Sequence, residues 1–430
     1  MALATRTTGY LGEGLYRDVP IVNPGKRSFW SKSDYVTKSL MESARSHYPD
    51  KPFRIATDVG EVLVLPPNCA DELRNHPNLD LGRVMEVDFH GHIKGFELTS
   101  LKGSNTHLVS SITRNQLTRL LPSLTPILSD EATHAIDSNI QAGGDWTKIQ
   151  LKPIVLDIVA RVSSRIFLGQ ELCRDEKWLD ITKTYTIDMF VAAAELRRWP
   201  QWSRPFIHWF LPRCKKLRMQ FLSARRVLSE AVRKRQEFVQ TNKTKGSAAQ
   251  GFDDAIEWAR DQSKAMKSPI DEAKFQLTMS VAAMHTTSDL LTQVIIDLAQ
   301  HPEVIKALRK ETSECLRRDG WTKSALYNMK LLDSTIKETQ RLKPASIAQL
   351  VSTSSDHLAF GHGQHVCPGR FFAAAEIKII MCHLLSRFDW KLEPGTAVKP
   401  FMVGFSAAAS PFAEVLFRKA GTGLDTGIAK

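Results

Sequence analysis

The feature of this sequence that most constrains its fold is a glycine-interrupted loop at residues 360–369, in which one cysteine, Cys367, precedes a segment from 370 to about 387. Apolar residues in that segment recur at helical spacing, which predicts an amphipathic helix. A sulfur at the start of a helix lies near unpaired N–H groups and the positive end of the helix dipole, and both favour thiolate over thiol. Because glycines lack a Cβ atom, the loop can also pass close to a large flat ligand. Such a sulfur can serve as an axial ligand of haem iron.

Two other interpretations of the loop compete. Gly361 and Gly363 could open a phosphate-binding loop, but no strand-like run and no full Gly-x-Gly-x-x-Gly surround them. His362, His365 and Cys367 could bind zinc, but no second pair of ligands lies at the spacing of a zinc finger. Each pattern therefore lacks the rest of the site that it would need.

The same ten residues resemble the haem-binding signature of the cytochrome P-450 family, Phe-x-x-Gly-x-(Arg or His)-x-Cys-x-Gly, and every fixed position is filled. The resemblance implies that Cys367 is the metal ligand. It also implies that Phe360, Gly363 and Gly369 shape the cofactor site. His365 stands at the arginine-or-histidine position and is the expected partner of a haem propionate.

The rest of the chain is mostly helical in pattern. From about 107 to 240, apolar residues recur every three or four positions, whereas residues 55–65 read as a β-hairpin that turns at 58–61. The polar stretch 241–251 predicts a loop inside a domain rather than a domain boundary. We therefore predict a single domain over residues 1–430, mainly α with a small β portion.

Two further helices are expected in the second half of the chain. Ser268 is a suitable N-cap for a long helix, with Pro269 in its first turn, that ends at Gln300 before His-Pro. Another helix is predicted from about 322 to 342, where Lys-Pro ends it. Both lengths suit helices that cross a large domain.

The middle of the long helix carries Ala-Ala-Met-His-Thr-Thr-Ser at 282–288. Small residues let a planar group approach, and two consecutive threonines are poor choices for a helix interior. The stretch is similar to the family's oxygen-activation motif, which implies that Thr286 hydrogen-bonds bound oxygen and relays protons. His285 stands where an acid is usual and can also shuttle protons. The alternative is that His285 is a partly buried helix residue and Thr286 only bonds back to a carbonyl.

Glu338 and Arg341 lie three residues apart on one face of the predicted helix at about 322–342. As an isolated pair they would contribute little. They also match the family's Glu-x-x-Arg element, which implies membership of a buried network that pins the haem-binding core. Only 26 positions separate Arg341 from Cys367, several tens fewer than in the family, and they contain no further arginine. We therefore expect a cytochrome P-450 fold that is incomplete between this helix and the cysteine loop, with one wall of the haem pocket open.

Charge and composition limit the partners. The net charge is +12, and nine basic residues but one acid fall between 213 and 235. No nucleic-acid recognition module accompanies them, so we expect no nucleic-acid partner. Tryptophans and phenylalanines at 199–210 lie beside this basic stretch, which indicates contact with an anionic membrane surface. A solvated basic face over a buried aromatic cluster is the alternative.

Location follows from what the chain lacks. Six cysteines without a repeated spacing argue for a reducing compartment. No run of 18 or more apolar residues occurs, and the first residues lack the core of a signal peptide, so we expect no transmembrane helix. The family's usual N-terminal anchor is expected to be absent. We predict a monomer on the cytoplasmic side, peripheral on the endoplasmic reticulum membrane.

The resemblance covers about residues 16–345 and 352–420. It implies a haem-dependent monooxygenase that uses O2 and electrons from an NADPH-dependent reductase. The stretch at 88–92 and the threonine motif are similar to fungal relatives of kaurene oxidase, which implies an apolar terpenoid or indole-terpenoid secondary metabolite as substrate. The alternative is a truncated, catalytically impaired form that binds haem poorly. A third reading, a helical protein that binds nucleic acid or membranes, explains the charge but not Cys367.

Overall fold

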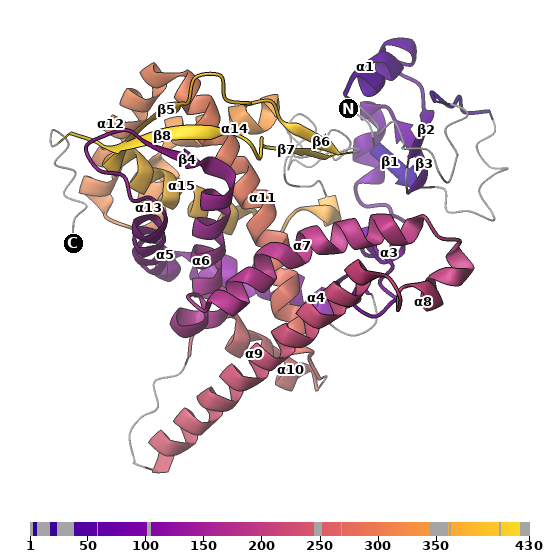
Figure 1. The fold of residues 1–430 in the computed structure, drawn as a ribbon, viewed down its shortest axis with the longest axis horizontal. Helices are drawn as coiled ribbons and strands as arrows, with labels where there is room; N and C mark the ends of the chain where they lie inside the picture. Colours follow the sequence, from indigo (N-terminus) through magenta and orange to yellow (C-terminus); the bar gives the residue numbers. More distant parts are fainter. Residues whose placement is uncertain are drawn as a thin grey trace.

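A computed structural model gives the fold of the chain (Figure 1). It describes residues 3–6, 18–23, 38–57, 59–100, 105–244, 252–267, 269–343, 360, 363–403 and 406–421. The α-helices are α1 (Lys38–His47), α2 (Ala70–Leu73), α3 (Leu81–Asp88), α4 (Asn105–Ile112), α5 (Thr118–Asn139), α6 (Leu151–Leu172), α7 (Glu176–Arg197), α8 (Arg204–Ile207), α9 (Pro212–Thr244), α10 (Ala255–Met266), α11 (Glu272–Gln300), α12 (Pro302–Asp319), α13 (Lys323–Asn328), α14 (Lys330–Leu342) and α15 (Arg370–Arg387). The prediction of a mainly α fold with a small β portion is confirmed.

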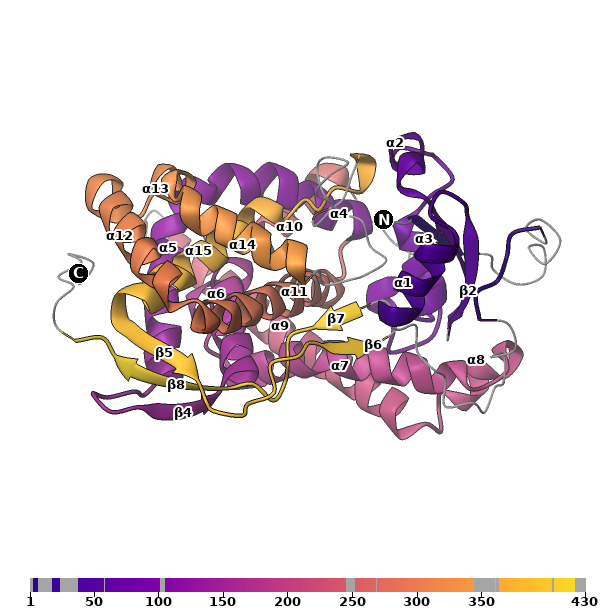
Figure 2. The ribbon, with the colours of Figure 1, turned by 90° about the horizontal axis from the view of Figure 1, so that it is seen from above.

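The strands form small antiparallel sheets at the edges of the helical body. They are β1 (Leu3–Arg6), β2 (Phe53–Thr57), β3 (Gly60–Leu65), β4 (Thr147–Gln150), β5 (Phe388–Leu392), β6 (Phe401–Val403), β7 (Ser406–Ala408) and β8 (Glu414–Lys419). The orders are β1-β3-β2, β4-β8-β5 and β6-β7. The two three-stranded sheets lie at opposite ends of the molecule in both views (Figures 1 and 2). The predicted hairpin is β2–β3, with Thr57 opposite Gly60.

The core lies where α5, α6, α11 and α15 pack together. Its largest fully buried side chains include Trp178, Tyr185, Phe167 and Phe275. Burying such side chains contributes about 1.5–3 kcal/mol each, which makes this helical layer the main source of stability. Of the helices that the structure describes, none combines the length and the apolar character that crossing a bilayer requires.

The long helix α11 begins three residues later than predicted. Asp271 is its N-cap, and one carboxylate oxygen accepts the N–H of Lys274 at 3.1 Å. The Asp271 side chain caps the helix as a serine could. The helix therefore begins after Asp271, and Pro269 lies outside it. Ser268 lies outside the described residues. The end at Gln300 is confirmed, and the 29 residues span about 44 Å.

The second predicted helix, 322–342, is in fact two helices. Thr322 caps α13, and the chain breaks at Met329, where φ is −74° and ψ is 76°. The carboxylate of Glu311 in α12 accepts the N–H groups of Leu331 and Leu332 at 2.7 and 2.9 Å. These N–H groups lie in the first turn of α14, where no carbonyl of the same helix can accept them. The Glu311 side chain accepts them instead and so caps the start of α14. Sequence periodicity contains no sign of this long-range contact.

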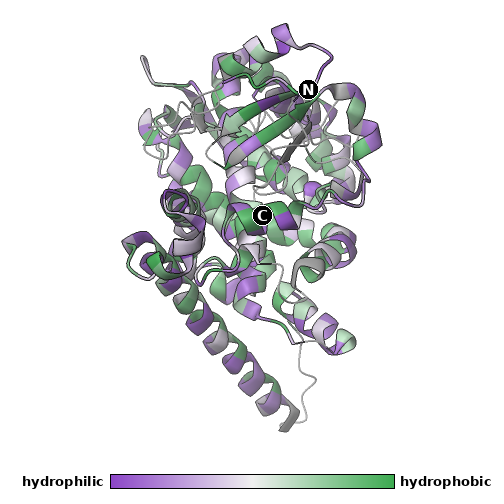
Figure 3. Cartoon of the chain, turned by 90° about the vertical axis from the view of Figure 1, so that its right-hand side faces the viewer, coloured by the Kyte–Doolittle hydropathy of each residue, from purple (hydrophilic) through white to green (hydrophobic). Residues whose placement is uncertain are grey.

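The predicted polar loop 241–251 is partly wrong, because α9 continues to Thr244. The far end of α9 projects from the helical body and is largely hydrophilic (Figure 3). A buried ion pair joins α9 to the start of α10. Arg235 donates to both carboxylate oxygens of Asp254, at 3.0 and 2.6 Å. Asp254 also caps α10. This pair fixes α10 against α9. Residues 245–251 lie outside the described part of the chain.

Candidate active site

The loop that carries Cys367 is closed by hydrogen bonds and leads directly into α15. The Cys367 N–H donates to the carbonyl oxygen of Phe360 at 2.6 Å. The Cys367 carbonyl oxygen accepts from Nη1 of Arg370, the first residue of α15, at 3.0 Å. Gly369 is the N-cap of α15. The sequence prediction of a helix from 370 to about 387 behind this loop is confirmed.

The ionisation of Cys367 differs from the sequence prediction. Burial raises the pKa of its thiol above the ordinary value, while N–H groups of Gly369 and Arg370 and the charge of Arg370 oppose that rise. The helix N-terminus therefore supplies the predicted donors, but desolvation of the thiolate outweighs them. A coordinated metal ion reverses this order, because a coordinating thiol is deprotonated outright.

Gly363 is fixed by its conformation and its surroundings. Its φ of +62° lies in the left-handed region, and a Cβ atom there would lie 2.6 Å from the carbonyl oxygen of Arg74. No residue with a side chain fits so close to another backbone. Gly363–His365 form the short 3-10 helix η5. The side chain of His365 lies outside what the structure describes, so its pairing with a propionate stays a prediction.

Two contacts place the end of the cysteine loop beside α11. A Cβ atom at Gly369 would lie 3.7 Å from Cγ2 of Thr113, which begins the π-helical turn η3 (Thr113–Leu117). The Thr113 hydroxyl lies 3.7 Å from the sulfur of Met279 in α11. Met279 and Thr286 are seven residues apart, about two turns, and share one face of the helix. The cysteine loop and this face of α11 therefore border the same region.

Small residues are exposed at the middle of α11. Most of α11 is buried, yet Ala282 and Thr286 are exposed and Ala283 is half-buried. The Thr286 hydroxyl donates to the carbonyl oxygen of Ala282 at 3.0 Å, as the alternative interpretation expected. The side chains of Ala282 and Thr286 therefore reach the surface at the centre of an otherwise largely buried helix.

His285 lies on a different side of α11 from Thr286. Successive residues of a helix are rotated by about 100°, so neighbours do not face the same way. Burial lowers the pKa of His285, while backbone groups of Lys183 and Thr182 in α7 oppose the shift. Its Nε2 is buried and has no hydrogen-bond partner among the described residues. The sequence therefore placed two polar groups together that the fold separates.

Glu338 and Arg341 form a pair, but not a buried one. Two hydrogen bonds of 2.8 and 2.7 Å join the guanidinium to the carboxylate. Both side chains are more than half exposed, at 53% for Glu338 and 62% for Arg341. The prediction that they belong to a buried network is therefore wrong for the described part of the chain. The physical reason is that no described element covers this face of α14.

Cys382 is an ordinary core residue, as its place inside α15 predicts. Its side chain is 1% exposed, and its sulfur lies 3.6 Å from that of Met329. Burial raises the pKa of this thiol far above its ordinary value. Cys382 therefore serves as a matched control for Cys367, since Cys382 lies inside α15 whereas Cys367 lies in the loop before it.

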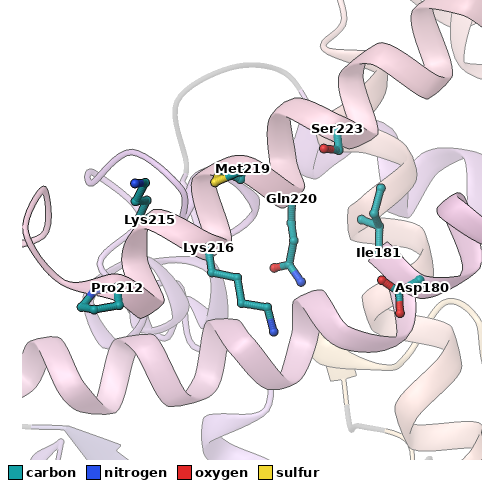
Figure 4. A pocket seen from close by; sticks show the side chains of 8 residues that line it. All are labelled: Asp180, Ile181, Pro212, Lys215, Lys216, Met219, Gln220 and Ser223. Atoms are coloured by element: carbon teal, nitrogen blue, oxygen red, sulfur yellow. The ribbon is translucent and has the colours of Figure 1, made fainter.

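A groove of about 380 Å³ lies between α7 and α9 and is separate from this region (Figure 4). Lys216 and Gln220 point from α9 toward α7, and Asp180 and Ile181 line the other wall. Lys216 is paired with Asp188 at 2.8 Å, so its charge is already matched. None of the groove's lining residues belongs to the cysteine loop or to α11. We therefore place the candidate site at Cys367 and not in this groove.

Three residues of the site escaped the sequence analysis: Asn75, Thr113 and Arg370. Arg370 could have been found, because a cation three residues after the cysteine marks the start of α15. Thr113 and Asn75 carry no local signal, since only the fold brings them to the loop.

The residues present fit a haem. A cysteine sulfur in a glycine-rich loop suits an iron ligand, and Gly369 leaves its surroundings free of side-chain bulk. The exposed residues at the centre of α11, Ala282 and Thr286, are also small. Cys367 would bind the iron and Gly369 would let the backbone approach the ring, whereas the side of Gly363 that a Cβ would occupy faces Arg74 and Asn75.

Comparison with known proteins identifies the family. The model of the cytochrome P-450 family matches residues 88–356 and 348–412, in two pieces. Cytochrome P-450 monooxygenase hepE of Aspergillus oryzae is 38% identical over 470 positions, which cover 93% of this chain and 86% of that protein. Cytochrome P-450 monooxygenase 2 of Gibberella fujikuroi is 36% identical, covering 93% of this chain and 89% of its own.

A solved structure has the same fold. The retinoic-acid-bound cyanobacterial CYP120A1 superposes with a TM-score of 0.65 at 14% identity and covers 90% of this chain and 95% of its own. TRI1 of Fusarium sporotrichioides, also a cytochrome P-450 monooxygenase, is 33% identical over 94% of this chain and 86% of its own. This chain therefore belongs to the cytochrome P-450 family and is a haem-thiolate monooxygenase.

Proposed function

We propose that this monooxygenase oxidises an apolar terpenoid or indole-terpenoid secondary metabolite, with Cys367 as its iron ligand. The observation that carries the proposal is that Ala282 and Thr286 are exposed on α11, the helix that meets the end of the cysteine loop through Thr113 and Met279. The terpenoid class is supported by the likeness of 88–92 and 282–287 to fungal relatives of kaurene oxidase. Electrons would come from an NADPH-dependent reductase. When bound, the haem supplies the oxygen chemistry that inserts one atom of O2 into a C–H bond.

The residues of the chain would hold and move the proton that this reaction consumes. Thr286 is exposed on α11 and can turn its hydroxyl from the Ala282 carbonyl toward a bound ligand. His285 faces α7 on another side of the helix, where burial lowers its pKa and favours the neutral ring. We propose Thr286 as the proton donor at the site.

Replacing Thr286 by alanine is expected to uncouple NADPH consumption from product formation and to release peroxide. General acid catalysis typically contributes about 10²–10⁴-fold, so product per NADPH should fall by at least about tenfold. The measurement compares NADPH, peroxide and product with a terpenoid that the wild type oxidises. Thr278→Ala is the matched control, since Thr278 also bonds back to a carbonyl of α11. Unchanged coupling in Thr286→Ala would return the hydroxyl to a structural role.

We also propose that the region from α8 to α9 rests on an anionic membrane surface of the endoplasmic reticulum. Trp202, Phe206 and Phe210 are 79%, 69% and 83% exposed, so the alternative of a buried aromatic cluster does not fit them. The basic helix α9 follows directly. Large exposed apolar side chains beside positive charge are typical of peripheral membrane contact.

Charge reversal of three exposed basic residues of α9, Lys215, Arg226 and Arg233, is expected to weaken binding to anionic vesicles by at least about 100-fold. Each basic residue near such a surface contributes about 1 kcal/mol. Arg225 is left unchanged because it bonds to Asp271, the cap of α11. Reversal of Lys306, Lys310 and Arg318 on α12 gives the same net charge at a distant surface and should have little effect. Equal losses in both variants would indicate general electrostatic attraction only.

One observation favours the second candidate, an impaired form. The Glu338–Arg341 pair is exposed, and none of the described residues gives it the cover that a buried network would need. The alignment with hepE spans 470 positions but only 93% of the 430 residues here, about 400, so about 70 positions face gaps. We propose that the active chain binds haem less tightly than a complete relative. The haem content of the purified protein tests this.

A further inference from the structure

We propose that Asn75 is a positioning residue that latches the loop carrying Cys367. The proposal rests on the proposed role of Cys367 as iron ligand and adds a residue outside the haem-binding signature. Asn75 follows α2, almost three hundred residues before the loop in sequence, so only the fold brings the two together.

The latch consists of two hydrogen bonds to one residue of the loop. The N–H of Gln364 donates to Oδ1 of Asn75 at 2.9 Å. The side-chain Nε2 of Gln364 donates to the carbonyl oxygen of His76 at 3.2 Å. Both contacts hold η5 against residues 75–76. The first depends on a side chain and can therefore be removed by substitution.

Close packing accompanies these bonds. A Cβ atom at Gly363 would overlap the amide oxygen of Asn75 and would lie 2.6 Å from the carbonyl oxygen of Arg74. Gly363 thus lets the loop come near enough for Gln364 to reach Asn75. The signature glycine and Asn75 form one contact, in which the glycine supplies the space and the asparagine supplies the acceptor.

The latch complements the bond that closes the loop from within. Cys367 N–H bonds to Phe360, which fixes the two ends of the loop to each other but not to the rest of the molecule. Asn75 fixes the same loop to the N-terminal part of the chain. Without it, the loop could move as a closed unit about the start of α15, and Cys367 would move with it.

The expected effect is moderate because Asn75 is exposed and water competes for its amide. Loss of one such hydrogen bond should raise the open population of the loop by about threefold to tenfold. In the haem-free full-length protein, the rate of Cys367 alkylation by iodoacetamide, followed by peptide mass spectrometry, should rise by that factor in Asn75→Ala. Asn75→Asp keeps an acceptor oxygen and should restore the wild-type rate.

Two controls separate the latch from general loosening. Cys69 lies in the short helix η1 (Pro67–Cys69) next to α2, so its alkylation rate reports on this segment itself and should not change. Asn78→Ala alters an exposed asparagine of the same segment without touching the latch and should leave Cys367 unchanged. In haem-loaded protein, Asn75→Ala should lower the fraction with a thiolate-type carbon-monoxide spectrum, and Asn75→Asp should recover it.

The outcomes decide between the claims. An unchanged Cys367 alkylation rate in Asn75→Ala, or an equal rise at Cys69, would overturn the latch. Failure of Asn75→Asp to restore the rate would also overturn it. If Cys367→Ser keeps the thiolate-type spectrum, the proposed ligand is wrong, whereas the alkylation of haem-free protein still tests the latch by itself.

Discussion

Glu376→Gln is expected to abolish a pH-dependent loss of stability that the wild type shows. Between about pH 4.5 and about pH 8 the free energy of unfolding of the wild type should fall by up to about 5 kcal/mol, and that of the variant should not. Glu376 lies in α15 and is fully buried between helices. Ser163 of α6 donates to one carboxyl oxygen at 2.7 Å, and the other oxygen has no partner among the described residues. Burial raises the pKa of this carboxyl to about 8, and the Ser163 hydrogen bond limits the rise.

The direction of the pH effect follows from proton counting. Between about pH 4.5 and about pH 8 the folded protein keeps the Glu376 proton, whereas the unfolded chain releases it. Stability therefore falls as pH rises through this window, by about 1.4 kcal/mol per unit, and is fully present below the unfolded pKa. Glutamine is neutral at every pH, so this slope should disappear.

The measurement is the free energy of urea unfolding at about pH 5 and about pH 8. Glu314→Gln changes an exposed glutamate of α12 and should leave the slope as in the wild type. Ser163→Ala removes the bond that lowers the pKa of Glu376 and should extend the window to higher pH. A slope that survives in Glu376→Gln would show that other groups cause it.

Sequence reasoning succeeded where the cause is local. The helix after Cys367 has the predicted bounds, because the glycine-rich loop marks its start, but residues 375–385 are all buried, so the prediction that it is amphipathic is wrong. The hairpin at 55–65 was also found, since its turn and its alternating pattern are adjacent in the chain. The end of α11 at Gln300 follows from one His-Pro pair.

It failed where a distant side chain decides the outcome. Glu311 caps α14 from another helix and so breaks the predicted helix at Met329. Asn75 and Thr113 join the cysteine loop only through the fold. The pKa of Cys367 depends on how deeply the loop is buried, and the helix N-terminus alone could not predict it.

The gap before the cysteine loop has a physical counterpart. The family model matches in two pieces that overlap at 348–356, within the segment where the sequence predicts missing residues. In the structure the Glu338–Arg341 pair lies exposed on α14. A pair that water can reach is weakly coupled to the rest of the core, so it cannot pin the haem-binding loop as a buried network would.

Cys367→Ser is expected to abolish the thiolate-type spectrum completely, the largest functional effect of any single change in this chain. Cys367 supplies the only sulfur among the described residues that lies in the glycine-rich loop before α15. A serine hydroxyl has the same position but does not provide the thiolate that iron ligation requires. Cys382→Ser alters a sulfur buried against Met329 and should leave the spectrum unchanged.

The reduced, carbon-monoxide-bound absorption spectrum of the purified full-length protein tests the central claim most directly. We expect the thiolate-type band in the wild type and in Cys382→Ser, with less than one haem per chain, and no such band in Cys367→Ser. A thiolate-type band that persists in Cys367→Ser, or is lost in Cys382→Ser instead, would contradict the assignment of Cys367 as the iron ligand.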